Sequence, residues 1–389
     1  MRFPLRPAFA ALALALALPA ASEEAGKPAS LDETLESIRE KHGLPALAAA
    51  IVTVDGLHSI GAVGARRAGG EDRATTGDLW HLGSCTKAMT ATLIARLVEQ
   101  ETLKWTTTLG EAFPKQRGMD DGWRPVTLEQ LLANRGGAPP ALDRAGLWAS
   151  LWAHQGTPTE GRKKLFAGVV RFPPEYEPGS KMLYANAGFA IAGYVAEMTT
   201  GESWEDLMRR EVFAPLGITS AGFGAPGRPG KAAAQPRGHG ADGKPVEPGP
   251  TADNPQAIAP AGTVHMTLED WGRFITAHLR GARGEAVTAA DGKAFLGAAS
   301  WTRLHTPPAD GYALGWSVGT RPGWARGPNP GDAGRILTHN GSNTMWFCVT
   351  WLAPEQGYAV LVATNSGGAT AEKATDDAAA ALIGLMRKR

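Results

Sequence analysis

The 389-residue sequence has few of the features that mark specialised protein classes. Only two cysteines occur, Cys85 and Cys348, so a framework of disulfides is excluded. The formal net charge is +1, which gives no reason to expect nucleic acid or an anionic membrane as a partner. The nine histidines occur without an H-E-x-x-H, H-x-H or C-x-x-C pattern. No metal site and no cofactor are therefore predicted.

The N-terminus carries the first positive signal. Arg2 and Arg6 precede an apolar run over residues 8–18, and small residues follow at 20–22. This pattern predicts a secretory signal peptide over residues 1–22, and the run is too short to span a membrane. We therefore expect a periplasmic or secreted protein without a membrane span after cleavage. An uncleaved N-terminal anchor is the alternative interpretation.

Hydrophobic patterning predicts strands near both ends of the chain and helices between them. Helical spacing is found at residues 31–42, 128–132, 187–198, 204–212 and 371–386, and in a long apolar stretch after Ser84. Strand patterns occur at residues 46–54, 57–63, 312–318, 336–338, 346–352 and 358–364. Asp55-Gly56 is a hairpin turn signal between the first two strands.

This order of elements predicts two structural units. We expect an α/β (α+β) fold in which residues 23–105 and 261–389 form a sheet domain, because one sheet can be built from both ends of a chain. Residues 106–260 are expected to form an all-helical second domain. Within it, residues 222–260 are rich in glycine, proline and alanine and are predicted to form a long loop with a hairpin at residues 241–243.

Ser84-Cys85-Thr86-Lys87 places a hydroxyl and an amine three residues apart, on one face of a helix. A serine hydroxyl is a poor nucleophile at neutral pH unless a neighbouring base takes its proton. A desolvated lysine has a lowered pKa and can act as that base. A serine and a lysine at this spacing are more often solvated neighbours, but here the surrounding helix is apolar. Ser84 is therefore predicted to be a nucleophile and Lys87 its partner.

Two further motifs follow in the order that this chemistry needs. Tyr184-Ala185-Asn186 precedes an apolar helix, and His339-Asn340-Gly341 precedes a probable strand. A phenol can pass a proton between nucleophile and leaving group, and an amide can orient Lys87 or a substrate carbonyl. A histidine there can donate a hydrogen bond to Tyr184 or to substrate, and a glycine allows substrate to approach the strand edge.

Together these motifs make the sequence resemble the serine β-lactamase and penicillin-binding-protein superfamily, in its branch of β-lactamase-related serine hydrolases. The resemblance rests on residues 82–87, 178–186, 260–264, 312–316 and 339–342 and covers nearly the whole mature chain. It implies an antiparallel sheet flanked by helices, with an all-helical second domain and the active site between them. It also implies Ser84, Lys87 and Tyr184 as catalytic residues. Asn186, His339, Gly341 and Ser342 would bind substrate, with the backbone N–H groups of Ser84 and Ser342 as the oxyanion hole.

One departure from the family pattern bears on the substrate. The third motif is His-Asn-Gly, where many β-lactamases have Lys-Thr-Gly, and a histidine holds a substrate carboxylate less firmly than a lysine. No acidic residue after Tyr184 is recognisable as a dedicated deacylating base. We therefore expect an esterase or D-peptidase acting on a small ester, amide, D-peptide or β-lactam. A true β-lactamase and a catalytically silent binder of cell-wall precursors are the alternatives.

A second nucleophile motif competes with the first. Residues 315–319 match G-x-S-x-G around Ser317, and Asp332 and His339 follow in the chain order of an α/β-hydrolase. That motif works only on a sharp strand-to-helix turn, and no helical pattern follows Ser317. The segment is predicted to be a strand.

The two cysteines are predicted to be free thiols. If the strand after Gly341 passes Ser84, Cys348 lies seven residues further on, about 23 Å along the strand. A disulfide needs Cα atoms within about 7 Å of each other.

Overall fold

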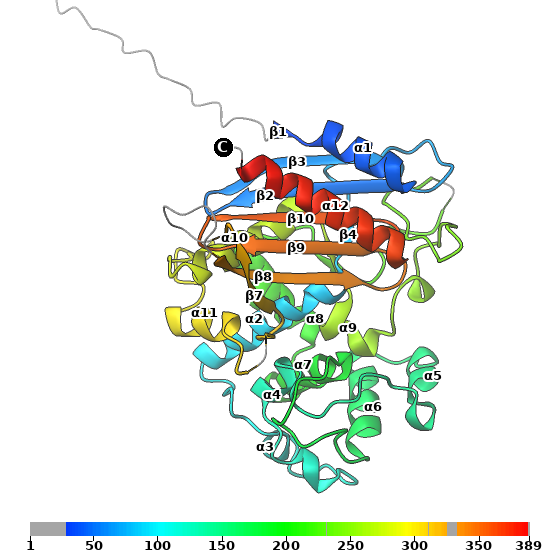
Figure 1. The fold of residues 1–389 in the computed structure, drawn as a ribbon. Helices are drawn as coiled ribbons and strands as arrows, with labels where there is room; N and C mark the ends of the chain where they lie inside the picture. The colour runs from blue at the N-terminus through cyan, green and yellow to red at the C-terminus, as the bar shows by residue number, and fades with distance from the viewer. Residues whose placement is uncertain (1–28, 231, 310, 325–332, 388–389) are drawn as a thin grey trace, which may run out of the picture.

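The computed structural model describes residues 29–230, 232–309, 311–324 and 333–387 (Figure 1). The predicted signal peptide lies outside these residues. Within them, no helix is both long enough and apolar enough to span a membrane.

A seven-stranded sheet drawn from both ends of the chain forms the upper part of the molecule in Figure 1. Neighbouring strands are antiparallel, except that β1 runs parallel to β3. The Asp55-Gly56 turn joins β2 to β3 as predicted. In spatial order the strands are β1 (Ala29–Ser30), β3 (Gly56–Gly64), β2 (Ala46–Thr53), β10 (Tyr358–Thr364), β9 (Phe347–Ala353), β8 (Ala333–Ser342) and β7 (Ser317–Pro322).

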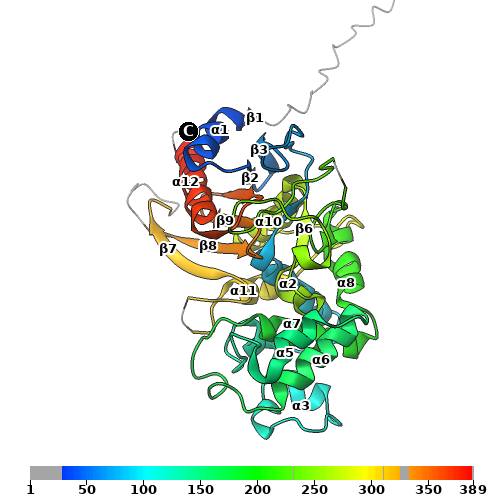
Figure 2. The ribbon, with the colours of Figure 1, turned by 90° about the vertical axis from the view of Figure 1, so that its right-hand side faces the viewer.

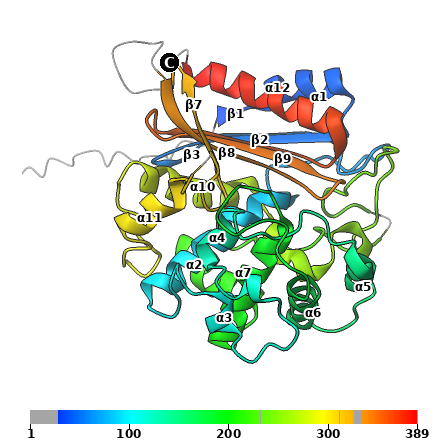
Figure 3. The ribbon, with the colours of Figure 1, turned by 60° about the horizontal axis from the view of Figure 1, so that its bottom comes forward.

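Helices cover both faces of this sheet, so its central strands are apolar on both sides. α1 (Asp32–His42) and α12 (Gly368–Arg387) lie on one face, and α10 (Leu268–Ala282) lies on the other (Figure 3). Alternate residues of β2 point to opposite faces of the sheet and pack against different helices. Leu47, Ala49 and Ile51 pack toward α1 and α12, whereas the residues between them pack toward α10. α11 (Ala298–His305) packs against α10.

The segment that leads to Ser84 lies below the main sheet. A second, three-stranded sheet has the order β4 (Trp80–His81), β6 (Val264–Met266) and β5 (Gly222–Phe223). β4 runs directly into a 3₁₀ turn, η1 (Gly83–Cys85), and then into α2 (Thr86–Glu99). Eleven of the fourteen residues of α2 are buried. α2 is therefore a core helix, as its apolar sequence predicted.

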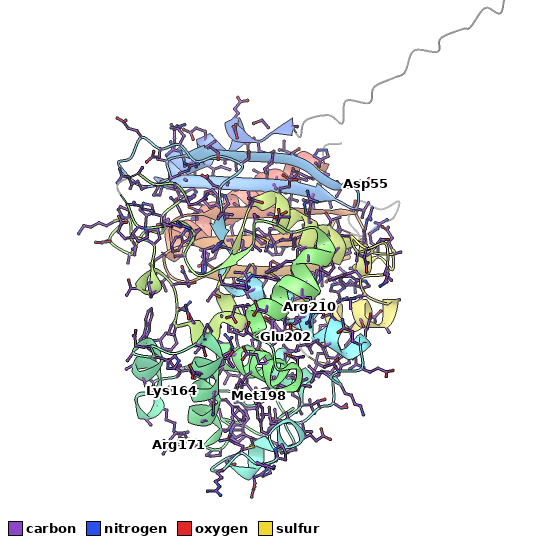
Figure 4. The ribbon with its side chains drawn as sticks, turned by 180° about the vertical axis from the view of Figure 1, so that it is seen from behind. Asp55, Lys164, Arg171, Met198, Glu202 and Arg210 are labelled. Carbon is purple, nitrogen blue, oxygen red and sulfur yellow. The ribbon has the colours of Figure 1, made fainter. Side chains whose placement is uncertain are left out.

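The remaining helices form the lower part of the molecule (Figure 2). Seen from behind, Asp55 marks the turn between β2 and β3 in the sheet, while Lys164 and Met198 lie on helices below it (Figure 4). The sheet flanked by helices and the helical second part confirm the predicted fold class. The boundaries at 105/106 and 260/261 stay a prediction. These helices are α3 (Leu109–Ala112), α4 (Leu128–Leu132), α5 (Leu147–Trp152), α6 (Pro158–Val170), α7 (Asn186–Thr200), α8 (Trp204–Leu207) and the adjoining π-helix η4 (Met208–Phe213), with α9 (Ala259–Gly262) at their junction with the sheet.

Two strand predictions differ from the structure in their extent. The strand predicted at 312–318 begins only at Ser317, because Ala313 and Trp316 close a tight backbone turn around Gly315. Gly315 has φ +83°, and a Cβ there would lie 2.6 Å from the backbone of Ala88. The strand predicted at 336–338 is longer, because β8 continues through His339 to Ser342. The loop hairpin near residue 242 forms as predicted, with His239 paired to Pro245.

A buried ion cluster joins three helices of the lower part and yields a stability prediction. Arg162 on α6 is fully buried and binds both carboxylate oxygens of Glu197 on α7 at 2.6–2.9 Å and those of Glu205 at 2.7–3.1 Å. Arg162→Met would leave the buried Glu197 carboxylate without its cation. We expect a loss of about 3–5 kcal/mol in the free energy of unfolding, measured by urea titration.

The control is Arg124→Met, which removes the exposed ion pair between Arg124 and Asp121. We expect that change to cost less than about 1 kcal/mol. Equal losses for the two variants would show that the Arg162 cluster does not stabilise the helical part.

Candidate active site

Ser84 lies in η1, at a point where two backbone segments touch. Gly83 has φ +46°, and a Cβ there would lie 2.3 Å from the backbone nitrogen of Ser342. A Cβ at Gly341 would lie 2.0 Å from the carbonyl oxygen of Leu82 and 2.9 Å from the nitrogen of Ser84. Only glycine fits at either position. The close approach brings the backbone nitrogen of Ser342 against Gly83 and that of Ser84 against Gly341.

Lys87, in the first turn of α2, is fully buried, and its Nζ contacts three oxygen atoms. It lies 3.1 Å from Ser84 Oγ, 2.7 Å from Asn186 Oδ1 and 2.7 Å from the carbonyl oxygen of Ala261. The aromatic ring of Tyr184 lies 4.7 Å from the same nitrogen. Burial lowers the pKa of Lys87 to about 7, because the ammonium ion loses its hydration.

The three contacts of Lys87 Nζ fit both of its protonation states. The Asn186 and Ala261 oxygens are acceptors only, so they take two N–H groups of Lys87 in either state. In the ammonium form the third N–H donates to Ser84 Oγ, whereas in the neutral form the lone pair faces the Ser84 hydroxyl, which can donate to it. With a pKa near 7, this form is well populated at neutral pH. The arrangement is therefore able to accept the proton of Ser84.

Tyr184 lies just before α7, and its ring lies 6.1 Å from that of His339 in β8. Burial raises the pKa of the phenol, and a hydrogen bond with Ser84 offsets only part of that effect. The phenol therefore stays protonated at neutral pH and can donate a proton. The residue as a whole is 36% exposed, so the site opens toward solvent on this side.

Asn134, which sequence reasoning missed, orders the segment that carries Tyr184. Its side-chain oxygen accepts from the backbone N–H of Ala185 at 3.0 Å, and its carbonyl accepts from that of Leu183 at 2.8 Å. Asn134 is buried with φ +55°, a left-handed conformation that asparagine tolerates better than most residues. In the sequence, the only indication of this role was an asparagine just after a short apolar helix.

His339 lies inside β8, not before a strand, and its hydrogen bonds differ from those predicted. Its Nδ1 lies 2.5 Å from the carbonyl oxygen of Asn340, so Nδ1 carries the proton. Its Nε2 therefore accepts from the hydroxyl of the buried Tyr312 at 3.2 Å. The ring is 6.1 Å from that of Tyr184, with no hydrogen bond between them among the described contacts. Tyr312 belongs to the 312–316 motif, but the sequence did not predict this contact with His339.

Ser342 and Gly341 end β8 beside Ser84. The hydroxyl of Ser342 donates to the carbonyl of Trp346 at 2.8 Å and accepts from the N–H of Thr344 at 2.9 Å. The side chain of Ser342 thus closes the turn into β9, and its backbone faces the nucleophile. The structure therefore brings together Ser84, Lys87, Tyr184, Asn186, His339, Gly341 and Ser342.

The competing motif around Ser317 does not form a nucleophile elbow. Ser317 begins β7 and pairs with Thr338 of β8, so no helix follows it. Asp332 lies outside the described residues. Ser317 therefore lies in a strand, as predicted, and not in a strand-to-helix turn.

Cys85 and Cys348 are free thiols as predicted, but the predicted distance between them is wrong. β8 ends at Ser342 and turns back into β9, so Cys348 pairs with Gly341 instead of lying seven residues beyond it. The two Sγ atoms lie 3.6 Å apart behind the nucleophile, and both side chains are buried.

This burial makes the thiols inaccessible. We expect a thiol reagent such as Ellman's reagent to titrate no thiol in the folded protein and two per chain after unfolding in guanidinium chloride. Rapid titration of the folded protein would contradict the packing, and fewer than two thiols after unfolding would indicate oxidation.

The chain matches a known protein family and is similar to several known proteins. A family model described as "Beta-lactamase" matches residues 31–385. The chain is similar to penicillin-binding protein 4 of Amycolatopsis lactamdurans, with 27% identity over 343 residues that cover 87% of this chain and 85% of that protein. It is also similar to an unguisins hydrolase of Aspergillus campestris, with 24% identity over 357 residues that cover 89% of this chain and 63% of that protein.

Among solved structures, the D-alanine carboxypeptidase AmpC from Burkholderia cenocepacia superposes with a TM-score of 0.65 and 20% identity. The superposition covers 89% of this chain and 96% of that one. At this level of identity the likeness shows the fold.

Proposed function

Because this chain belongs to the beta-lactamase family, we propose that it is a serine hydrolase that cleaves an ester or amide through an acyl-enzyme on Ser84. The observation that carries the proposal is the environment of Lys87: a fully buried amine with a pKa of about 7, 3.1 Å from Ser84 Oγ. Two acceptor oxygens hold its N–H groups, so its lone pair is free for the serine proton.

In the proposed acylation step, Lys87 takes the proton of Ser84 while Oγ attacks the substrate carbonyl. The developing oxyanion is stabilised by the backbone N–H groups of Ser84 and Ser342, whose juxtaposition supports this role. Tyr184 is hydrogen-bonded to Ser84 and protonated at neutral pH, so it can donate a proton to the leaving group. Lys87 then returns the proton to Tyr184.

In the proposed deacylation step, a water molecule takes the place of the leaving group. Lys87 and Tyr184 both contact Ser84 Oγ, and the same pair, acting in the reverse direction, can take a proton from that water. Ser84 leaves as the hydroxyl and the free acid is released.

The contacts of His339 bear on the substrate class. Its Nδ1–H donates to Asn340 and its Nε2 accepts from Tyr312, so it directs no N–H at a substrate carboxylate. This supports a substrate that needs no carboxylate at this position, such as a simple ester or a D-amino-acid amide. We therefore favour an esterase, or a D-peptidase that does not need to bind a C-terminal carboxylate, over a β-lactamase. A periplasmic or secreted location is part of the proposal.

The test is a panel of three substrates: a p-nitrophenyl ester, a chromogenic cephalosporin and a D-alanyl-D-alanine peptide. We expect turnover of the ester to exceed that of the cephalosporin. A fluorophosphonate should add one label to folded protein, on the peptide that contains Ser84. A folded protein that takes no label and turns over none of the three would favour a silent binding protein.

A further inference from the structure

His81, the last residue of β4, is a buried histidine three residues before the nucleophile. Its side chain is inaccessible to solvent, with Nε2 2.7 Å from Asp253 Oδ2 and Nδ1 3.1 Å from the backbone nitrogen of Gly83. A backbone N–H can only donate, so Nδ1 accepts from Gly83. Nε2 therefore carries the ring proton and donates it to the carboxylate of Asp253. The two neighbours fix one tautomer of His81.

Asp253 connects this histidine to the turn after β8. Its Oδ1 accepts from Asn343 Nδ2 at 3.0 Å and from the backbone N–H of Asn254 at 2.7 Å. Asn343 Oδ1 in turn accepts from the backbone N–H groups of Met345 and Trp346. All three side chains, of His81, Asp253 and Asn343, are buried.

The ring of Trp346 completes the link, because it stacks on His81 with the ring centroids 5.5 Å apart. One end of the network therefore holds Gly83, next to Ser84, and the other end holds the turn next to Ser342. These are the two segments whose backbones touch in the site.

We infer that His81 and Asp253 are a positioning pair that holds the Gly83–Ser84 turn against Ser342, and so sets the geometry of the nucleophile and the oxyanion hole. The inference rests on the proposed function. Neither residue reaches Ser84 Oγ in the described contacts, so they act through Gly83 and Asn343. The carboxylate is essential to this arrangement because all three of its partners are donors.

Asp253→Asn tests the pair with the smallest change of shape. If the new amide nitrogen faces His81, it donates to Nε2, so the ring proton moves to Nδ1. There it opposes the backbone N–H of Gly83. If the amide is turned the other way, its N–H groups lie against the donors of Asn254 and Asn343, and their hydrogen bonds are lost. Either orientation disturbs one of the two segments. We expect kcat for ester hydrolysis to fall about 10- to 100-fold with little change in KM, as for a reacting group displaced by about 1 Å.

Two substitutions of His81 separate its two hydrogen bonds. His81→Asn keeps an acceptor near the Nδ1 position for Gly83, whereas His81→Gln keeps a donor near the Nε2 position for Asp253. We expect His81→Asn to retain more kcat than His81→Gln, because the bond to Gly83 is the one that reaches the nucleophile. Asp242→Asn, an exposed carboxylate in the same long loop, is the control and should keep wild-type kcat and KM.

Thermal denaturation shows whether each variant is folded, and the two His81 variants keep the test valid if Asp253→Asn fails to fold. Nitrogen-15 NMR of the imidazole should show the ring proton on Nε2 in the wild type. Wild-type kcat in folded Asp253→Asn and His81→Gln, or an Nδ1–H tautomer in the wild type, would overturn the inference. A wild type no faster than Ser84→Ala would overturn the proposed function itself, which is a different result.

Discussion

Replacing Ser84 by alanine is expected to lower kcat/KM on every substrate that the protein turns over by roughly 10⁴-fold or more. The hydroxyl is the atom that forms the acyl-enzyme, and no other nucleophile lies within hydrogen-bond distance of Lys87 Nζ among the described residues. The side chain is small and only partly buried, so the variant should fold and melt near the wild-type temperature. The measurement is initial-rate kinetics corrected for spontaneous hydrolysis.

The matched control is Ser317→Ala, which removes the serine of the competing G-x-S-x-G motif. Ser317 begins β7 and pairs with Thr338, so its hydroxyl takes no part in the proposed site. We expect wild-type rates and wild-type labelling by a fluorophosphonate. If Ser84→Ala kept more than about a tenth of the wild-type rate, the acyl-enzyme mechanism would be wrong.

The sequence predicted those parts of the site that depend on short-range patterns. Ser84 and Lys87 are three residues apart, and the apolar helix after them indicated that the amine would be buried. Continuous apolar runs predicted β2 and β10 in the same way, because each strand is buried on both faces. In each case the relevant neighbours are set by the local geometry of the helix or strand.

Contacts between distant segments could not be predicted in this way. The carbonyl oxygen of Ala261 binds Lys87, but a backbone acceptor leaves no side-chain signal. His81 and Asp253 are 172 positions apart, and neither belongs to a recognisable motif. The error about Cys348 has the same origin. It depended on where β8 ends, and the tight turn at residues 342–346 is held by side-chain bonds of Ser342 and Asn343 that periodicity does not encode.

Replacing Lys87 by methionine is expected to abolish the pH dependence of the reaction as well as most of its rate. In the wild type, Lys87 must be neutral to accept the serine proton, and burial lowers its pKa to about 7. Below that pH the ammonium form dominates and kcat/KM should fall, whereas above it kcat/KM should reach a plateau. The raised pKa of Tyr184 keeps the phenol protonated across this plateau, so no fall is expected from it near neutral pH.

Loss of a general base costs about 10²- to 10⁴-fold in rate, and we expect Lys87→Met to fall in that range. Lys87→Arg should be equally impaired although it keeps a cation, because a guanidinium stays protonated at any accessible pH. Lys181→Met, at an exposed lysine close to Tyr184 in the sequence, should keep both the rate and the profile.

The profile of kcat/KM between pH 5 and 9 decides between two roles for Lys87. If it served only as a fixed positive charge, Lys87→Arg would restore activity and the wild-type rate would be highest below pH 7. A base requires the opposite on both counts. The lowered pKa of about 7 favours the base, because it makes the neutral amine available at neutral pH, with its lone pair toward Ser84 Oγ at 3.1 Å.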